Sequence, residues 1–141
     1  MKINYLLLSL CFIVSCNSKP DMEEVSKLNG FWEIQKAETP YEEKTYTMNQ
    51  TVDYIQIEDS TGFRKKVQPS YLGNYQSSQN REYFTVKDYE ESLVLEYRSD
   101  YDTWTETLLN LEEDQFVVKN EQNFIYTYKR HEPQSIDFDE E

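Results

Sequence analysis

Cysteine is almost absent from this chain of 141 residues, which has only Cys11 and Cys16. Both lie near the N-terminus, so the rest of the chain holds no thiol for a disulfide framework, a thiol nucleophile or a cysteine-based metal site. Histidine is represented by His131 alone. A serine–histidine–aspartate set or a histidine-rich metal site therefore cannot be assembled around the domain, and we expect no metal and no other cofactor.

Glycine and alanine are also scarce, with three glycines and a single alanine, Ala37. Aromatic residues are abundant by contrast, at 15% of the chain, with twelve tyrosines and seven phenylalanines. Large aromatic side chains bury much apolar area per residue and are favoured in strands. The composition therefore favours a β-rich domain whose core rests on aromatic packing.

Basic residues are outnumbered by acidic ones, 14 to 27, which gives a net charge of −13. Such a charge repels nucleic acid and anionic lipid headgroups. We therefore expect no nucleic-acid partner, and the acidic residues serve chiefly for solubility. Carboxylates are so common in this chain that a pair of them is not evidence for a catalytic site. We therefore expect the protein not to be an enzyme. A carboxylate-based hydrolase is the exception that stays open.

The N-terminus has the pattern of a secretory signal. Lys2 is followed by an apolar run over residues 3–14, then by Ser15 and Cys16. The run is too short to span a bilayer, which takes about 20 apolar residues. A small residue directly before a cysteine resembles the lipobox of bacterial lipoproteins. The resemblance implies cleavage after Ser15, acylation of Cys16 and a place in the bacterial cell envelope, whereas an ordinary secretory signal with a chance cysteine is the alternative.

Removing 15 of the 141 residues leaves 126, a usual size for one domain. We expect a signal peptide over residues 1–15, a lipidated tether over 16–21, a β-barrel over 22–131 and an acidic, disordered tail over 132–141. We also expect the domain to be a monomer.

A short helical turn is predicted over Met22 to Leu28, where apolar residues recur at a spacing of three. From Gly30 onward, apolar and polar residues alternate in about nine short strands separated by turn residues. The predicted strands are Gly30–Glu38, Thr51–Glu58, Phe63–Gln68, Tyr71–Tyr75, Glu82–Lys87, Leu93–Arg98, Thr103–Leu111, Gln115–Lys119 and Phe124–Lys129. Asp59 to Gly62 is predicted as a turn, and the fold class is all-β, either a barrel or a sandwich.

The first predicted strand begins with Gly30, and Trp32 follows two positions later. This resembles the first signature of the lipocalins and of bacterial lipocalin-like lipoproteins. The resemblance implies a small antiparallel up-and-down barrel of about eight or nine strands with a helical turn before it. It also implies that Arg130, or else Lys129, packs its cation against the Trp32 ring at the base of the barrel.

One predicted strand carries an unusual charge. If Phe63 and Val67 point into the barrel, Lys65 between them points inward too, and a buried ammonium needs a partner. Glu106 is the mid-strand acid that we nominate, and such a pair would recognise the polar head of a ligand. The alternative is a basic edge strand whose charges discourage association between sheets.

Aromatic side chains complete the predicted ligand site. Trp104 is a candidate although either face of its strand can be inside, and Tyr97 and Tyr126 belong to a tyrosine set able to line a cavity. The resulting prediction is a membrane-anchored binding module for a small apolar or amphipathic molecule. The alternative is an envelope interaction or assembly protein with a filled barrel, which binds a partner protein or a glycan by its surface.

Overall fold

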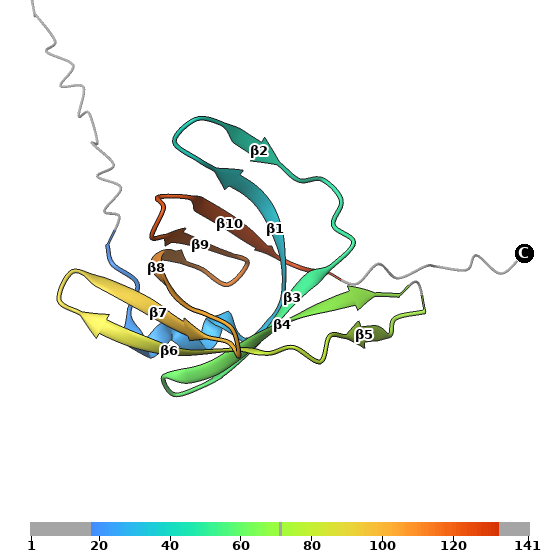
Figure 1. Cartoon of the computed structure of the whole chain (residues 1–141), viewed down its shortest axis with the longest axis horizontal. Helices are drawn as coiled ribbons and strands as arrows, with labels where there is room; N and C mark the ends of the chain where they lie inside the picture. Colours follow the sequence, from blue (N-terminus) through green and yellow to red (C-terminus); the bar gives the residue numbers. More distant parts are fainter. Residues whose placement is uncertain (1–17, 71, 133–141) are drawn as a thin grey trace, which may run out of the picture.

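The computed structural model describes residues 18–70 and 72–132 (Figure 1). The predicted signal peptide, the predicted lipidation site Cys16 and nearly all of the predicted acidic tail lie outside the described residues. Within them, the fold consists of one short helix followed by strands. The elements are η1 (Met22–Leu28), β1 (Gly30–Glu38), β2 (Glu43–Thr45), β3 (Val52–Glu58), β4 (Thr61–Pro69), β5 (Tyr75–Ser77), β6 (Glu82–Tyr89), β7 (Ser92–Arg98), β8 (Thr103–Leu111), β9 (Gln115–Asn120) and β10 (Ile125–Arg130).

Eight of these strands close into an antiparallel barrel in the order β1, β3, β4, β6, β7, β8, β9, β10. The closing pair is β10 with β1, the last strand with the first. The short strands β2 and β5 lie outside this ring, β2 paired with the end of β1 and β5 with the end of β4. The predicted all-β, up-and-down barrel is therefore confirmed.

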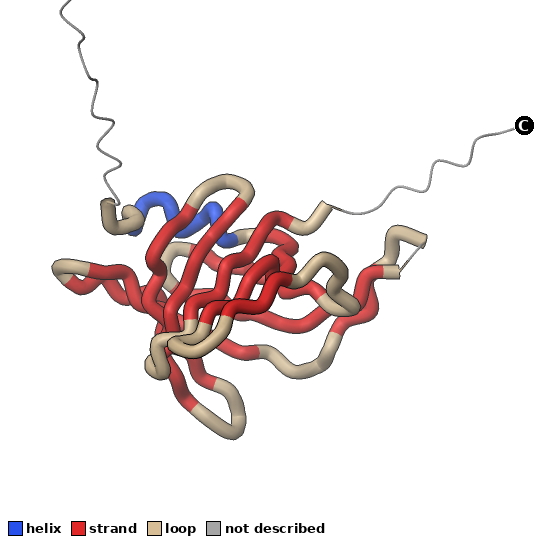
Figure 2. The backbone as a smooth tube through the Cα atoms, turned by 90° about the horizontal axis from the view of Figure 1, so that it is seen from above, coloured by secondary structure: helices blue, strands red, loops and turns tan. Residues whose placement is uncertain are grey.

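The helix η1 is a 3-10 helix that packs against the strands near one end of the barrel (Figure 2). The side chain of Asp21 caps it by accepting a hydrogen bond from the Glu23 backbone amide at 3.0 Å. Val25 and Leu28 turn their apolar side chains to the barrel and are buried. The helix contacts β3 and β8, so it covers the base between them.

The core fills the barrel from this base upward. Its largest fully buried side chain is Trp32, which packs edge-on against Phe116, and the leucines of β7 and β8 belong to the same core. The buried apolar residues facing the interior include Leu28, Trp32, Ile55, Ile57, Phe84, Val86, Leu93, Leu95, Leu108, Phe116 and Val118. Alternation in β7 is regular, because Leu93, Leu95 and Tyr97 are buried while the residues between them are only half-buried.

An aromatic cluster covers part of the outer wall. Phe31 on β1 stacks on Tyr75 of β5 with ring centroids 4.4 Å apart, and it contacts Tyr54 of β3 at 4.9 Å. Val52 and Val67, which are register partners on the same face as Tyr54, are buried as well. Apolar and aromatic side chains therefore cover the outer face of the wall between β1 and β4 as well.

Three expectations on strand limits are wrong. The strand predicted over Tyr71–Tyr75 is displaced: residues 72–74 are not part of a strand, and β5 covers Tyr75–Ser77, where Tyr75 stacks on Phe31. The strand β2 was not predicted, because Glu43–Thr45 is fully exposed and shows no apolar alternation. The turn predicted over Asp59 to Gly62 is only two residues long, and β4 begins at Thr61.

Candidate functional site

The base of the barrel is closed by a clamp around Trp32. The Trp32 indole Nε1 donates a hydrogen bond to the Leu28 carbonyl at 2.8 Å. The Arg130 guanidinium lies over the Trp32 ring, with its central carbon 3.8 Å from the ring centroid, and it donates to the carbonyls of Lys27 and Asn29. This is the position that the lipocalin resemblance implies for Arg130. These groups close the base of the barrel.

Gly30 permits this clamp to form. Its φ of 120° is a conformation that residues with a Cβ rarely adopt, and a Cβ there would lie 2.8 Å from Nη1 of Arg130. The glycine thus lets the guanidinium approach the backbone closely enough to bind the carbonyls around it.

Toward the other end, the barrel interior carries a group of charges that we call the interior cluster: Asp53, Arg64, Lys66, Glu82 and Glu106. Arg64 is at its centre. Its Nε lies 2.8 Å from Oε2 of Glu82, and its Nη1 lies 3.4 Å from Oε2 of Glu106. Asp53, whose side chain is 2% exposed, pairs with Lys66 at 2.6 Å. With every group ionised the interior cluster has a net charge of −1, from three carboxylates and two cations.

Burial has the largest effect on the pKa of the two central groups, Glu106 and Arg64. Burial raises the pKa of Glu106, and the attraction of Arg64 offsets that rise only in part. Burial also lowers the pKa of Arg64, but the negative potential of its surroundings, including Glu106, outweighs this and holds the pKa above its usual range. Burial likewise raises the pKa of Tyr97 and of Tyr128. The interior cluster therefore holds one permanent cation beside a carboxyl group that takes up a proton more readily than an exposed one.

Aromatic rings continue from Arg64 around the wall. The Arg64 guanidinium lies over the Tyr97 ring at 4.6 Å from its centroid. Tyr97 in turn stacks on Trp104, with centroids 5.1 Å apart and planes at 4°. Because β7 lies between β8 and the β6–β4 pair, Tyr97 is sandwiched between the guanidinium and the indole. Trp104 is only half-buried, so the row of rings ends on a partly accessible indole.

Comparisons with known proteins concern the fold. No protein-family model matches the chain, and a search of curated sequences finds no significant match. Among solved structures, lobster apocrustacyanin A1 superposes with a TM-score of 0.50 at 13% identity, over 83% of this chain and 67% of that protein. Apocrustacyanin C1 gives 0.48 at 11% identity, over 79% and 64%. A lipocalin-like protein from Bacteroides uniformis gives 0.47 at 7% identity, over 74% and 99%.

The eight-stranded antiparallel barrel, closed by its first and last strands, agrees with the likeness to lobster apocrustacyanin A1. The fold is lipocalin-like. At such low identities the likeness concerns the fold alone, so the chemistry of this lipocalin-like barrel has to be argued from its own residues.

Four of the five predicted ligand-site residues meet on the inner face of the lipocalin-like barrel. Tyr97, Trp104 and Glu106 lie on the neighbouring strands β7 and β8, and the half-buried Tyr126 on β10 lies on the inner face as well. The inward position of Glu106 is notable because its side chain is only 8% exposed. Their role in binding a ligand remains a prediction.

The fifth residue, Lys65, does not join them. Its ammonium lies over the ring of Tyr54 on the outer wall, 5.5 Å from the centroid, so the predicted pair of Lys65 with Glu106 is wrong. The cation opposite Glu106 is Arg64 instead. The reason is register: Ile55 pairs with Arg64 across the β3–β4 hairpin, so Arg64 shares the inward face of Ile55.

Within residues 18–70 and 72–132, no group of three or more histidine, cysteine or acidic side chains is arranged to hold a metal ion. In the same part of the chain, no helix has the length and apolar character needed to cross a bilayer.

Proposed function

We propose that the end of the barrel opposite the Trp32 clamp binds a small amphipathic molecule. The observation that carries the proposal is the row from Arg64 through Tyr97 to the half-buried Trp104. Buried ion pairs add little stability compared with apolar packing of the same volume. We therefore infer that the charges beside the partly accessible indole serve to recognise a ligand and not only to stabilise the fold. An aromatic or apolar part of the ligand would pack on Trp104, with its polar group toward the interior cluster.

The charge of the interior cluster narrows the ligand class. Its net charge of −1, within a chain of net charge −13, disfavours a carboxylate head. A neutral hydroxylated head or an amine suits it better, because Glu106 can accept a hydrogen bond when ionised and donate one when protonated. We therefore propose a neutral or cationic amphipathic ligand.

Three defined probes test this proposal: N-phenyl-1-naphthylamine as a neutral ligand, dodecyltrimethylammonium as a cation and dodecanoate as an anion. We expect saturable binding of the first two, measured by fluorescence and calorimetry, and at least tenfold weaker binding of dodecanoate. Trp104→Ala should weaken binding about tenfold or more, since a stacked aromatic contact and its buried area are worth roughly 1.5–3 kcal/mol. The matched control is Tyr89→Ala, an exposed aromatic residue next to the β6–β7 turn. Absence of saturable binding to all three probes, or equal binding by Trp104→Ala, would refute the proposal.

We further propose that Cys16 anchors this barrel in the bacterial cell envelope through covalent lipid. The support is the apolar run that ends in Ser15 and Cys16. Two or more acyl chains on one residue hold a protein stably at a membrane, whereas one chain does so only marginally. Expression of the full chain and of Cys16→Ser in a bacterial host, followed by membrane fractionation and mass analysis of the mature N-terminus, tests the anchor. An unmodified Cys16, or equal membrane recovery of both forms, would contradict it.

A further inference from the structure

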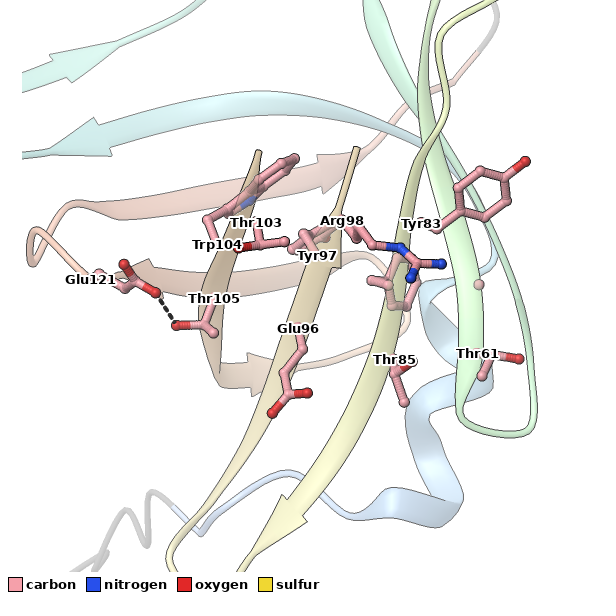
Figure 3. A pocket seen from close by; sticks show the side chains of 12 residues that line it. Thr61, Tyr83, Thr85, Glu96, Tyr97, Arg98, Thr103, Trp104, Thr105 and Glu121 are labelled. Atoms are coloured by element: carbon pink, nitrogen blue, oxygen red, sulfur yellow. Dashed lines mark hydrogen bonds between the residues drawn. The ribbon is translucent and has the colours of Figure 1, made fainter. Parts of the chain in front are cut away.

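A second candidate site is a cavity on the outer side of the barrel wall. It has a volume of about 580 Å³ and spans β4, β6, β7 and β8 (Figure 3). We call it the outer trough. The side chains that matter most here are Tyr83, Glu96, Arg98, Thr105 and Glu121. Its volume lies within the range of about 300–1,000 Å³ that is usual for ligand pockets.

Strand register explains the shape of the outer trough. Thr61, Thr85, Glu96 and Thr105 are consecutive register partners on four neighbouring strands, so their side chains form one row across the outer face. The next row on that face, two residues along each strand, contains Tyr83, Arg98 and Thr103.

Between the two rows run Gly62, Phe84, Tyr97 and Trp104, which are register partners of one another. Phe84 and Tyr97 are buried in the core, so the outer face of this middle row is backbone. The outer trough is therefore a groove with a backbone floor and two walls of side chains, running across the strands.

One wall is built to accept hydrogen bonds. Thr105 Oγ1 donates to Glu121 Oε1 at 2.9 Å, as the dashed line in Figure 3 shows. The Tyr89 hydroxyl donates to Glu96 Oε1, also at 2.9 Å. Each carboxylate is thus oriented through one oxygen, and its second oxygen is available to a donor on a ligand. The threonine hydroxyls of the row both donate and accept.

The opposite wall offers an aromatic face. Tyr83 is 51% exposed, and its ring is held in a T-shaped contact with Phe63 at 6.3 Å between centroids. Arg98, its register partner on β7, supplies fixed hydrogen-bond donors on the same wall. A ligand that lies across the strands would thus meet a ring and a guanidinium on one side and carboxylates and hydroxyls on the other.

This chemistry selects the class of ligand. The backbone groups of β4, β6, β7 and β8 are paired along the trough, so an extended peptide cannot bind there by adding a strand. Glu96, Glu121 and Arg98 leave a net charge of −1 in a chain of net charge −13, which disfavours anionic polymers. Alternating hydroxyl, carboxylate and aromatic groups suit a polyhydroxylated, uncharged ligand. We propose that the outer trough binds a neutral glycan.

The trough goes beyond the function proposed above. Glu106 and the stacked rings of Tyr97 and Trp104 face the interior from β7 and β8, whereas Tyr83 on β6 and Glu96 on β7 face outward. The two sites can therefore be changed independently by substitution.

Affinity electrophoresis of the folded domain tests the proposal, with gels that contain amylopectin, galactomannan, arabinoxylan or laminarin as neutral glycans and polygalacturonate as an anionic one. We expect retardation by at least one neutral glycan and none by polygalacturonate. Tyr83→Ala and Glu96→Gln should each weaken the retardation at least tenfold. The matched controls, Tyr101→Ala and Glu90→Gln, change an exposed tyrosine and an exposed glutamate outside the trough and should leave it unchanged.

Three other results of these experiments would contradict the proposal that the outer trough binds a neutral glycan. No retardation by any neutral glycan, or retardation by polygalacturonate alone, would overturn the proposal. Retardation that persists in both Tyr83→Ala and Glu96→Gln would place the glycan elsewhere and overturn it too. Because both residues lie on the outer wall, thermal unfolding should show that these variants fold as the parent does.

Discussion

Replacement of Arg64 by methionine is the sharpest test of the charge balance inside the barrel. The change removes the cation beside Glu106 while Glu106, with a side chain 8% exposed, stays buried. Removing one partner of a buried ion pair costs about 3–5 kcal/mol. The contact with Glu82 adds little, because that side chain is 38% exposed and exposed pairs are worth about 0–1 kcal/mol. We expect the free energy of unfolding to fall by about 3 kcal/mol at pH 8.

The pH dependence of this loss has a definite sign. Burial raises the pKa of Glu106 in the folded chain, so the folded state binds a proton more tightly than the unfolded state does. Stability from this group therefore decreases as the pH rises through the folded-state pKa. Without Arg64 that pKa rises further, and the decrease extends to higher pH. The Arg64→Met variant should thus lose less stability at pH 5 than at pH 8.

Urea unfolding at pH 5, 6, 7 and 8, followed by tryptophan fluorescence, measures these values. Lys65→Met is the matched control, since it removes a neighbouring cation from the outer wall and should change stability by less than about 0.5 kcal/mol at every pH. If Arg64→Met does not fold, the double variant Arg64→Met with Glu106→Gln should restore folding by removing the stranded carboxylate. A loss below about 1 kcal/mol at pH 8, or an equal loss in Lys65→Met, would refute the reasoning.

Three further substitutions test other contacts of the barrel. Arg130→Met should lower the free energy of unfolding by about 2–4 kcal/mol, because it removes a cation–π contact with Trp32 together with charged hydrogen bonds to carbonyls; an unchanged urea midpoint would contradict this. Gly62→Ala should cost about 1–3 kcal/mol in thermal unfolding, since its Cβ would lie 2.4 Å from the Gln56 carbonyl oxygen, a backbone atom that cannot move aside easily. Burial alone would raise the pKa of Glu33, but hydrogen bonds from its basic neighbours on and after β10 outweigh burial and lower this pKa. The Glu33 carboxylate therefore stabilises the fold at neutral pH, and this stabilisation is lost as the pH falls. Glu33→Gln should therefore cost about 0.5–1 kcal/mol at pH 7 and nothing at pH 3, and a loss independent of pH would show that the carboxylate charge is irrelevant.

The sequence predicts the barrel well because its regular strands alternate clearly. In β7, for example, Leu93, Leu95 and Tyr97 fall on one face with polar or half-buried residues between them. The strand limits of β1 and β8 agree with the predicted ones, Gly30–Glu38 and Thr103–Leu111. The sequence left open which face of β8 is inside; in the structure Glu106 and Leu108 share the buried face.

The prediction fails in β4, where apolar and aromatic side chains cover the outer face of the wall. The hypothesis that Phe63 and Val67 point into the barrel is wrong. Phe63 lies on the outer wall among aromatic side chains, Val67 shares its face, and Arg64 faces inward. The orientation of β4 depends on the length of the turn between β3 and β4, which the sequence does not specify. A two-residue turn at Asp59, whose φ of 54° is tolerated by aspartate, places Arg64 opposite the inward Ile55. Shifting the pairing by one residue reverses every side chain of the strand.

The closure of the barrel by β1 and β10 has a consequence for how the chain folds. Arg130 binds the Asn29 carbonyl across 101 residues of sequence, whereas the β6–β7 and β7–β8 hairpins join neighbours. Contacts between distant residues carry a larger loop-closure entropy and form more slowly than local ones. We therefore expect the central hairpins to form early and the seal over Trp32 to form last, so that a chain emerging from its site of synthesis keeps its core open until Arg130 is free to join Asn29.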